Sequence, residues 1–233
     1  MPTPSHQVPV VTRWILGSLI FWSILGIPFL HYRYRYTSCK RLRVVEPGKL
    51  YRSGMMTGVG LRRTLKALKI KTVINLMEES PEAELPATFF DRSKVSEKEI
   101  CEEMGVNFRF MQVELINPRY LPEKRPKTME TFIEIMNNPD NYPVLIHCRA
   151  GLHRTGVLTA MYRMEFDGWS KEKAWKEMKA HGFGELNCYA SNDYIDQYIC
   201  KFEPGQTHKY ATKTPDQKIP IHKVSMDSSN NNE

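Results

Sequence analysis

Residues 144–156 decide the fold, and they read Val-Leu-Ile-His-Cys-Arg-Ala-Gly-Leu-His-Arg-Thr-Gly. An aliphatic run ends at Cys148, a short loop carrying Gly151 follows, and Arg154 stands where a helical pattern begins. This order predicts a strand, a loop and a helix. The N–H groups of such a loop point inward and the helix N-terminus adds partial positive charge, which together form a site for a phosphate dianion. The residues predicted to bind the phosphate are Arg149, Ala150, Gly151, Leu152, His153 and Arg154.

Cys148 lies at the mouth of this predicted anion site. The groups that bind phosphate also stabilise a thiolate, and they typically lower a cysteine pKa to about 3.5–7.5. Arg154 offers a planar fork for two phosphate oxygens, and the Thr155 hydroxyl can hydrogen-bond the sulfur. His147 either orients the cysteine loop or is a satisfied core histidine. The alternative for Cys148, a small buried hydrophobe, does not explain its joint spacing with Gly151 and Arg154.

The pattern His-Cys-(five residues)-Arg-Thr-Gly resembles the signature of the cysteine-dependent protein tyrosine and dual-specificity phosphatases. The stretch 50–53, Leu-Tyr-Arg-Ser, is similar to the entry strand of the dual-specificity-like enzymes, and most of all to the atypical plant-and-fungal branch and its bacterial relatives. The resemblance covers roughly residues 44–202. It implies a two-step hydrolysis of phosphomonoesters without metal or cofactor, in which Cys148 forms a cysteinyl-phosphate and water then hydrolyses it.

The general acid is the point at which this sequence departs from the family pattern. The resembling enzymes carry an aspartate in a mobile loop that protonates the leaving oxygen, whereas residues 92–139 contain no aspartate. Asp91, Glu114 and Glu123 are the candidates that remain. Since a general acid contributes about 10²–10⁴-fold, a chain without one is a slow enzyme or a phosphate-binding pseudophosphatase that acts as an interaction module. An inert structural anchor protein is a third class of function.

Residues 14–30 form an apolar run without charge. As a helix the run would be about 25 Å long, near the lower limit for crossing a bilayer core. A cleaved signal peptide is the alternative, but no small-residue cleavage site follows the run, which favours a retained anchor. Arg13 precedes the run, and the basic residues that follow it are Arg33, Arg35, Lys40, Arg41 and Arg43. The positive-inside rule therefore predicts a single-pass membrane protein with a cytoplasmic catalytic domain.

The chain divides into five predicted segments. These are an N-terminal segment (1–13), a transmembrane anchor (14–31), a basic juxtamembrane linker (32–43), a phosphatase-like catalytic domain (44–202) and a polar tail predicted to be disordered (203–233). Strands and helices alternate in the catalytic segment, which predicts an α/β fold with a central, mostly parallel sheet flanked by helices.

Composition limits the partners. The net charge of +7 suits acidic partners, and no nucleic-acid motif accompanies it. The five cysteines show neither disulfide nor metal spacing, and a reducing compartment suits a thiolate nucleophile. The residues 149–151, Arg-Ala-Gly, are similar to the loop opening of phosphatases that act on inositol phosphates or phospholipid headgroups. Phosphotyrosine- or phosphoserine-type protein substrates remain the alternative, with the membrane as the second partner.

Overall fold

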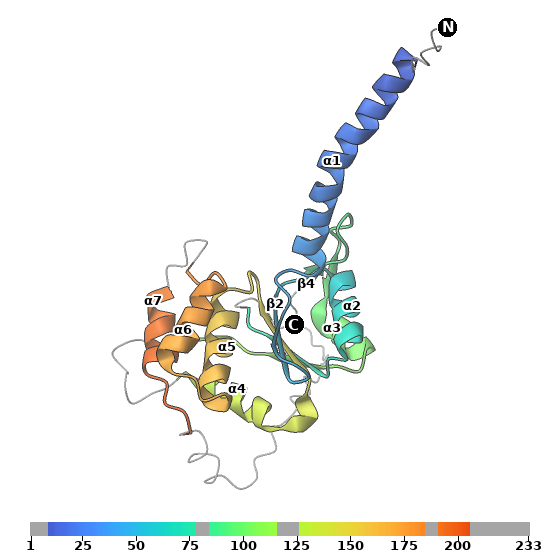
Figure 1. The fold of residues 1–233 in the computed structure, drawn as a ribbon. Helices are drawn as coiled ribbons and strands as arrows, with labels where there is room; N and C mark the ends of the chain where they lie inside the picture. Colours follow the sequence, from blue (N-terminus) through green and yellow to red (C-terminus); the bar gives the residue numbers. More distant parts are fainter. Residues whose placement is uncertain (1–8, 78–83, 116–125, 185–190, 206–233) are drawn as a thin grey trace, which may run out of the picture. The chain divides into compact units, whose positions relative to one another are not determined.

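The computed structural model describes residues 9–77, 84–115, 126–184 and 191–205 (Figure 1). The chain separates into two units, residues 1–202 and 203–233, and the description that follows concerns the first. Most of the predicted tail and of the predicted N-terminal segment lies outside the described residues.

Helices and strands alternate along the first unit. The helices are α1 (Val10–Ser38), α2 (Gly58–Leu68), α3 (Glu97–Glu103), α4 (Lys127–Asn137), α5 (His153–Phe166), α6 (Lys171–Ala180) and α7 (Ser191–Ile195), with short helical turns η2 (Pro139–Asn141) and η3 (Asp196–Cys200). The strands are β1 (Arg43–Glu46), β2 (Leu50–Gly54), β3 (Thr72–Asn75), β4 (Glu84–Pro86), β5 (Lys94–Ser96), β6 (Asn107–Phe110) and β7 (Val144–Cys148).

A five-stranded sheet with the order β1-β2-β7-β3-β6 carries the fold. Strand β7 lies at its centre and pairs in parallel with β2 and β3, and only the β1–β2 pairing is antiparallel. All five residues of β7 are buried, as expected for a strand covered on both faces. The predicted α/β fold with a mostly parallel sheet is confirmed. Because the carboxyl ends of parallel strands meet at one edge, Gly54, Asn75 and Cys148 end their strands at the same edge.

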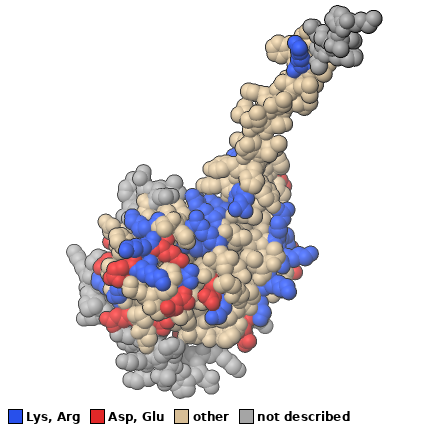
Figure 2. All heavy atoms as spheres, in the orientation of Figure 1, with Lys and Arg blue, Asp and Glu red and all other residues tan. Residues whose placement is uncertain are grey.

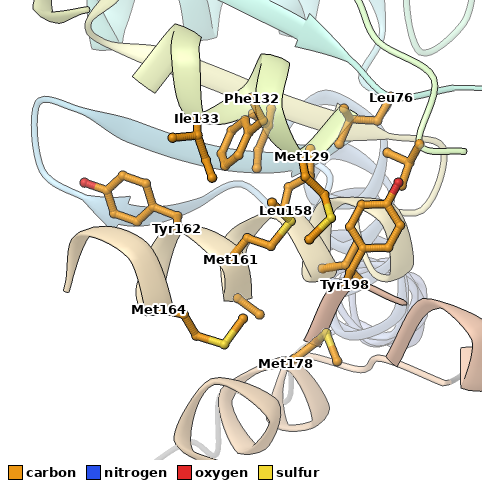
Figure 3. Close-up of a cluster of buried hydrophobic side chains, with 14 of the residues drawn as sticks. Leu76, Met129, Phe132, Ile133, Leu158, Met161, Tyr162, Met164, Met178 and Tyr198 are labelled. Carbon is orange, nitrogen blue, oxygen red and sulfur yellow. The ribbon is translucent and has the colours of Figure 1, made fainter. Parts of the chain in front are cut away.

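Two hydrophobic clusters cover the faces of this sheet. Helices α2 and α3 lie on one side, and α4, α5 and α6 lie on the other (Figure 1). Figure 3 shows Met129 and Phe132 of α4 facing Leu158 and Met161 of α5. Four apolar residues of α4 recur at helical spacing and are buried, namely Met129, Phe132, Ile133 and Met136. This packing fixes the start of α5, and so the loop that precedes it.

Helix α1 differs from the other helices because most of it is exposed. Its apolar window has a mean hydropathy of 1.7 and none of that window is buried. By length and composition this helix is able to cross a membrane, although signal sequences pass the same test. Its last turn is different: Ser38 is buried, and the carbonyl of Thr37 accepts a hydrogen bond of 3.1 Å from the N–H of Thr57. The helix therefore runs on through the first part of the predicted linker and ends against α2.

The fold predicts that two phenylalanines contribute very differently to the free energy of unfolding. Phe132 is fully buried between α4 and α5, whereas Phe90 is 84 % exposed. We expect Phe132→Ala to lower the free energy of unfolding by about 3–5 kcal/mol, because it removes buried surface and leaves a cavity. The control Phe90→Ala should change it by less than about 0.5 kcal/mol. Urea unfolding of the full chain in detergent measures both, and equal shifts would contradict this account of the core.

Candidate active site

The loop between β7 and α5 is shaped by Gly151. This residue has φ of 73°, a left-handed conformation that suits glycine. A Cβ at this position would lie 2.5 Å from the backbone nitrogen of Gly54, because the end of β2 runs directly against the loop. Cys148 ends β7 and α5 begins at His153, so the strand, loop and helix follow in the predicted order.

The thiol of Cys148 is buried and faces hydrogen-bond donors. The N–H of Gly151 donates to Sγ over 3.2 Å. Burial raises the pKa of the Cys148 thiol, but the hydroxyl and N–H of Thr155, the N–H of Gly151 and the charge of His147 outweigh it, and the pKa lies below its ordinary value. The structure thus brings Thr155 and Gly151 to the sulfur, in an arrangement that favours a thiolate.

Arg154 stands in the first turn of α5 beside the sheet edge. Its Nε lies 3.3 Å from the hydroxyl of Tyr194 on α7, and an Nη lies 3.4 Å from the carbonyl of Leu76 after β3. These two contacts orient the guanidinium. A fork held in this way can bind an anion at the mouth of the loop.

The buried carboxylate of Glu97 contacts His147, the residue that precedes Cys148. It opens α3, is 1 % exposed, and its Oε1 lies 2.6 Å from Nε2 of His147. Its Oε2 accepts a hydrogen bond of 2.7 Å from Nδ2 of Asn75, whose Oδ1 in turn accepts one of 2.8 Å from the N–H of Met77. Burial lowers the pKa of His147. The charge and the hydrogen bond of Glu97 raise it by a larger amount, so the pKa lies above its ordinary value. This contact supports the orienting role considered for His147.

The sequence did not single out Glu97. The Ser96 side chain accepts a hydrogen bond of 3.2 Å from the N–H of Glu99 and so caps the start of α3. An acidic residue in the first turn of a helix ordinarily lies at the surface and complements the helix dipole. The sequence position of Glu97 fits this ordinary explanation. Only the tertiary packing of α3 on the sheet shows that this carboxylate is buried.

Two arginines bind the outward-facing carbonyls of the loop. Arg52 of β2 donates to the carbonyl of Gly151 over 2.9 Å, and Arg41 donates to that of Ala150 over 3.0 Å. Burial lowers the pKa of Arg52 to about 10, with the nearby charge of Arg43 acting in the same direction. Neither Arg41 nor Arg52 was predicted as a site residue.

The remaining predicted phosphate-binding residues border the loop. Arg149 is exposed at its tip and Leu152 is buried beneath it. The ring of His153 packs edge-on against Phe183, with 5.4 Å between the centroids. Lys40 is half-buried nearby; burial lowers the pKa of its ammonium, and among the weaker influences the Cys148 thiolate raises it. Figure 2 shows Lys and Arg side chains gathered at the foot of α1.

The three candidate general acids have different surroundings. The carboxylate of Asp91 accepts a hydrogen bond of 2.8 Å from Ser93, and this bond lowers the Asp91 pKa. The carboxylate of Glu114 accepts one of 2.6 Å from the N–H of Lys127 at the start of α4. Glu123 lies outside the described residues. The assignment of the acid stays a prediction.

No group of three or more metal-binding side chains that could hold an ion occurs within the part of the chain that the structure describes. The donors around Cys148 are instead the N–H groups of Gly151 and Thr155 and the hydroxyl of Thr155, which suit a phosphoryl group.

Comparison with known proteins gives several relatives. Dual specificity protein phosphatase TpbA of Pseudomonas aeruginosa is 51 % identical over 43 residues, which are 18 % of this chain and 20 % of TpbA. Putative tyrosine-protein phosphatase OCA1 of Scheffersomyces stipitis is 24 % identical over 185 residues, 75 % of this chain and 84 % of OCA1. Inositol diphosphatase SIW14 of Saccharomyces cerevisiae is 35 % identical over 66 residues, 28 % of this chain and 23 % of SIW14.

Comparison of the fold with solved structures also finds SIW14. The crystal structure of the SIW14 core catalytic domain superposes with a TM-score of 0.53 at 22 % identity, covering 74 % of this chain and 91 % of that domain. A sequence model of the tyrosine phosphatase family matches residues 39–217, which include the whole β7–α5 loop. The chain therefore belongs to the tyrosine phosphatase family.

Proposed function

We propose that this protein is a membrane-anchored, cysteine-dependent phosphatase that hydrolyses phosphomonoesters through a cysteinyl-phosphate. The observation that carries the proposal is the buried Cys148 sulfur. It accepts a hydrogen bond from the N–H of Gly151, in a loop that leads directly into helix α5. The names of the relatives, dual specificity protein phosphatase and inositol diphosphatase, support the same class of reaction.

The reaction begins at the thiolate. Sγ of Cys148 attacks phosphorus, the bond to the ester oxygen breaks, and that oxygen takes a proton from a general acid. Water then attacks phosphorus and gives a proton to the deprotonated general acid, the S–P bond breaks, and inorganic phosphate leaves as the thiolate is restored. Arg154 and the loop N–H groups hold the equatorial oxygens, and they fit the trigonal arrangement of these oxygens in the transition state better than the tetrahedral ester. The hydroxyl of Thr155 stabilises the sulfur as a leaving group in the second step.

The substrate we favour carries more than one anionic group. Arg149 and Lys40 add positive charge at the mouth of the loop, beyond what a single phosphate needs. An inositol phosphate or phospholipid headgroup satisfies this condition, and the name of SIW14 points in the same direction. A phosphoprotein substrate, which the name of TpbA suggests, is the alternative.

Membrane anchoring through residues 14–30 completes the proposal. The apolar helix α1 is exposed over its whole apolar window, so nothing in the described protein covers it. Basic residues follow the apolar run, which supports a cytoplasmic position for the catalytic domain. An anchored enzyme meets phospholipid headgroups at the bilayer surface.

Turnover of an aryl phosphate by the full chain in detergent, with EDTA present, tests the reaction. We expect Cys148→Ser to abolish hydrolysis, because the hydroxyl is not ionised at neutral pH, and Arg154→Ala to lower kcat by about 10²–10³-fold. The control Cys200→Ser removes an exposed thiol and should leave turnover unchanged. Binding of vanadate without any turnover would instead identify a pseudophosphatase.

The Glu97–His147 pair predicts a pH effect. Glu97→Gln keeps a hydrogen-bonding group but removes the charge that raises the His147 pKa, so the histidine becomes neutral at lower pH. The positive charge that lowers the Cys148 pKa is then lost, and that pKa rises. Since the thiolate is the reactive form, the acidic limb of kcat/KM should move to higher pH.

The matched control is Glu99→Gln, an exposed carboxylate of the same helix turn. Its pH profile should coincide with that of the wild type. Coinciding profiles for both variants would contradict the proposed link between Glu97 and the thiol.

Arg149 distinguishes the two substrate classes. We expect Arg149→Ala to lower kcat/KM for a polyphosphorylated inositol about tenfold more than for an aryl phosphate, because only the first substrate presents a second anion. Lys98→Ala, which removes an exposed charge on α3, serves as the control. Equal losses on the two substrates would remove the preference for multiply charged esters.

A further inference from the structure

We propose that Arg41, which lies between the membrane helix and the sheet, is a positioning residue for the catalytic loop. Its guanidinium holds the peptide between Ala150 and Gly151 so that the N–H of this peptide points at the Cys148 sulfur. The kinetic part of this inference rests on the proposed phosphatase function, whereas its structural part does not.

The argument follows from the planarity of one peptide group. In a trans peptide the C=O and the N–H point in opposite directions. The carbonyl of Ala150 accepts the hydrogen bond of 3.0 Å from Arg41, and the N–H of Gly151 donates the one of 3.2 Å to Sγ. Both bonds use the same peptide plane, one at each end. A rotation of that plane would break them together, so the bond outside the loop fixes the donor inside it.

The next peptide of the loop is held in the same way. The carbonyl of Gly151 accepts a hydrogen bond of 2.9 Å from Arg52. The N–H of Leu152, at the other end of that plane, therefore points away from Arg52 and towards the anion site. Arg52 comes from β2 inside the domain, whereas Arg41 comes from the segment after α1, so two separate parts of the chain set the loop.

The segment that carries Arg41 is itself fixed to the domain. Arg41 has φ of 50°, which is uncommon for a residue with a side chain and is unfavourable by itself. The carbonyl of Lys40 accepts a hydrogen bond of 2.7 Å from the N–H of Gly54, and the N–H of Leu42 donates one of 3.0 Å to Cys39. A strained conformation of this kind persists only where surrounding contacts determine it.

Other charged groups face the sulfur and remain when Arg41 is replaced. They are His147 of β7, Lys40 of the same segment and Arg52 of β2, and Glu97 of α3 stands behind His147. Loss of Arg41 therefore removes one hydrogen bond and one charge from a site that stays basic. The two effects need separate measurements.

The test uses the full chain in detergent and the variant Arg41→Asn, because asparagine tolerates a positive φ but cannot replace the guanidinium. Hydrogen exchange of the peptide that covers residues 148–154 reports the positioning, and the pH dependence of Cys148 alkylation, followed by mass spectrometry, reports the thiol. We expect loop exchange to become about tenfold faster, the Cys148 pKa to rise and kcat/KM for an aryl phosphate to fall about tenfold.

Arg62→Gln is the control, since it removes a surface arginine that pairs with Glu103. Loop exchange that matches this control would overturn the inference even if the Cys148 pKa rose, because a charge effect alone leaves the peptide plane in place. Unchanged hydrogen exchange elsewhere in the chain shows that the fold is intact. Arg41→Lys keeps a hydrogen-bond donor, so we expect it to change loop exchange in the same direction but by less. A wild type that does not hydrolyse the aryl phosphate would defeat the proposed function, whereas loop exchange and alkylation still decide the role of Arg41.

Discussion

The orientation of the peptide planes between Cys148 and Arg154 is the constraint on which the site depends. A backbone amide can stabilise a thiolate or a phosphate only if its own carbonyl faces away, and a carbonyl turned away from the site needs a donor of its own. Arg41 and Arg52 provide those donors. Gly151 completes the arrangement, because its positive φ and missing side chain let the loop lie against the end of β2.

The buried pair of Glu97 and His147 adds a second constraint on the same cysteine. An isolated buried carboxylate is costly, so Glu97 is paired with a histidine and also accepts a hydrogen bond from Asn75. This pairing raises the pKa of His147 and so favours its protonated form next to Cys148. The sign of its contribution to stability follows: a histidine pKa raised by folding stabilises the native state below the unfolded pKa, and that stabilisation is lost as pH rises through the folded pKa.

The sequence predicted those features that depend on short stretches of chain. The aliphatic strand, Gly151 and Arg154 lie within one stretch, and their spacing predicted the strand, loop and helix that the structure contains. The helical spacing of the apolar residues in α4 likewise agrees with the face that is buried. Helix α1 extends beyond its apolar run at both ends, so hydropathy alone could not predict where it begins and ends. The helix also continues through Pro28.

The groups that support the loop were missed because they are distant in sequence. Glu97 lies 50 positions from His147, and Arg52 and Arg41 lie 99 and 109 positions from their carbonyl acceptors. Each belongs to a local pattern with an ordinary explanation, such as a helix terminus, a strand or a basic flank of a membrane helix. Only the folded sheet brings them together.

The position of β7 in the sheet has a consequence for biosynthesis. Strands β2 and β3 do not pair with each other, since β7 lies between them, and β7 begins about 90 residues after β2 ends. At ribosomal rates of about 5–20 residues per second, the edge of β2 waits roughly 5–20 s for β7, and the edge of β3 waits roughly 3–14 s. Cys148 ends β7, so the nascent chain acquires this cysteine and closes its sheet in a single event. An incomplete chain released before this event carries two unpaired strand edges and lacks Cys148, which makes it prone to aggregation.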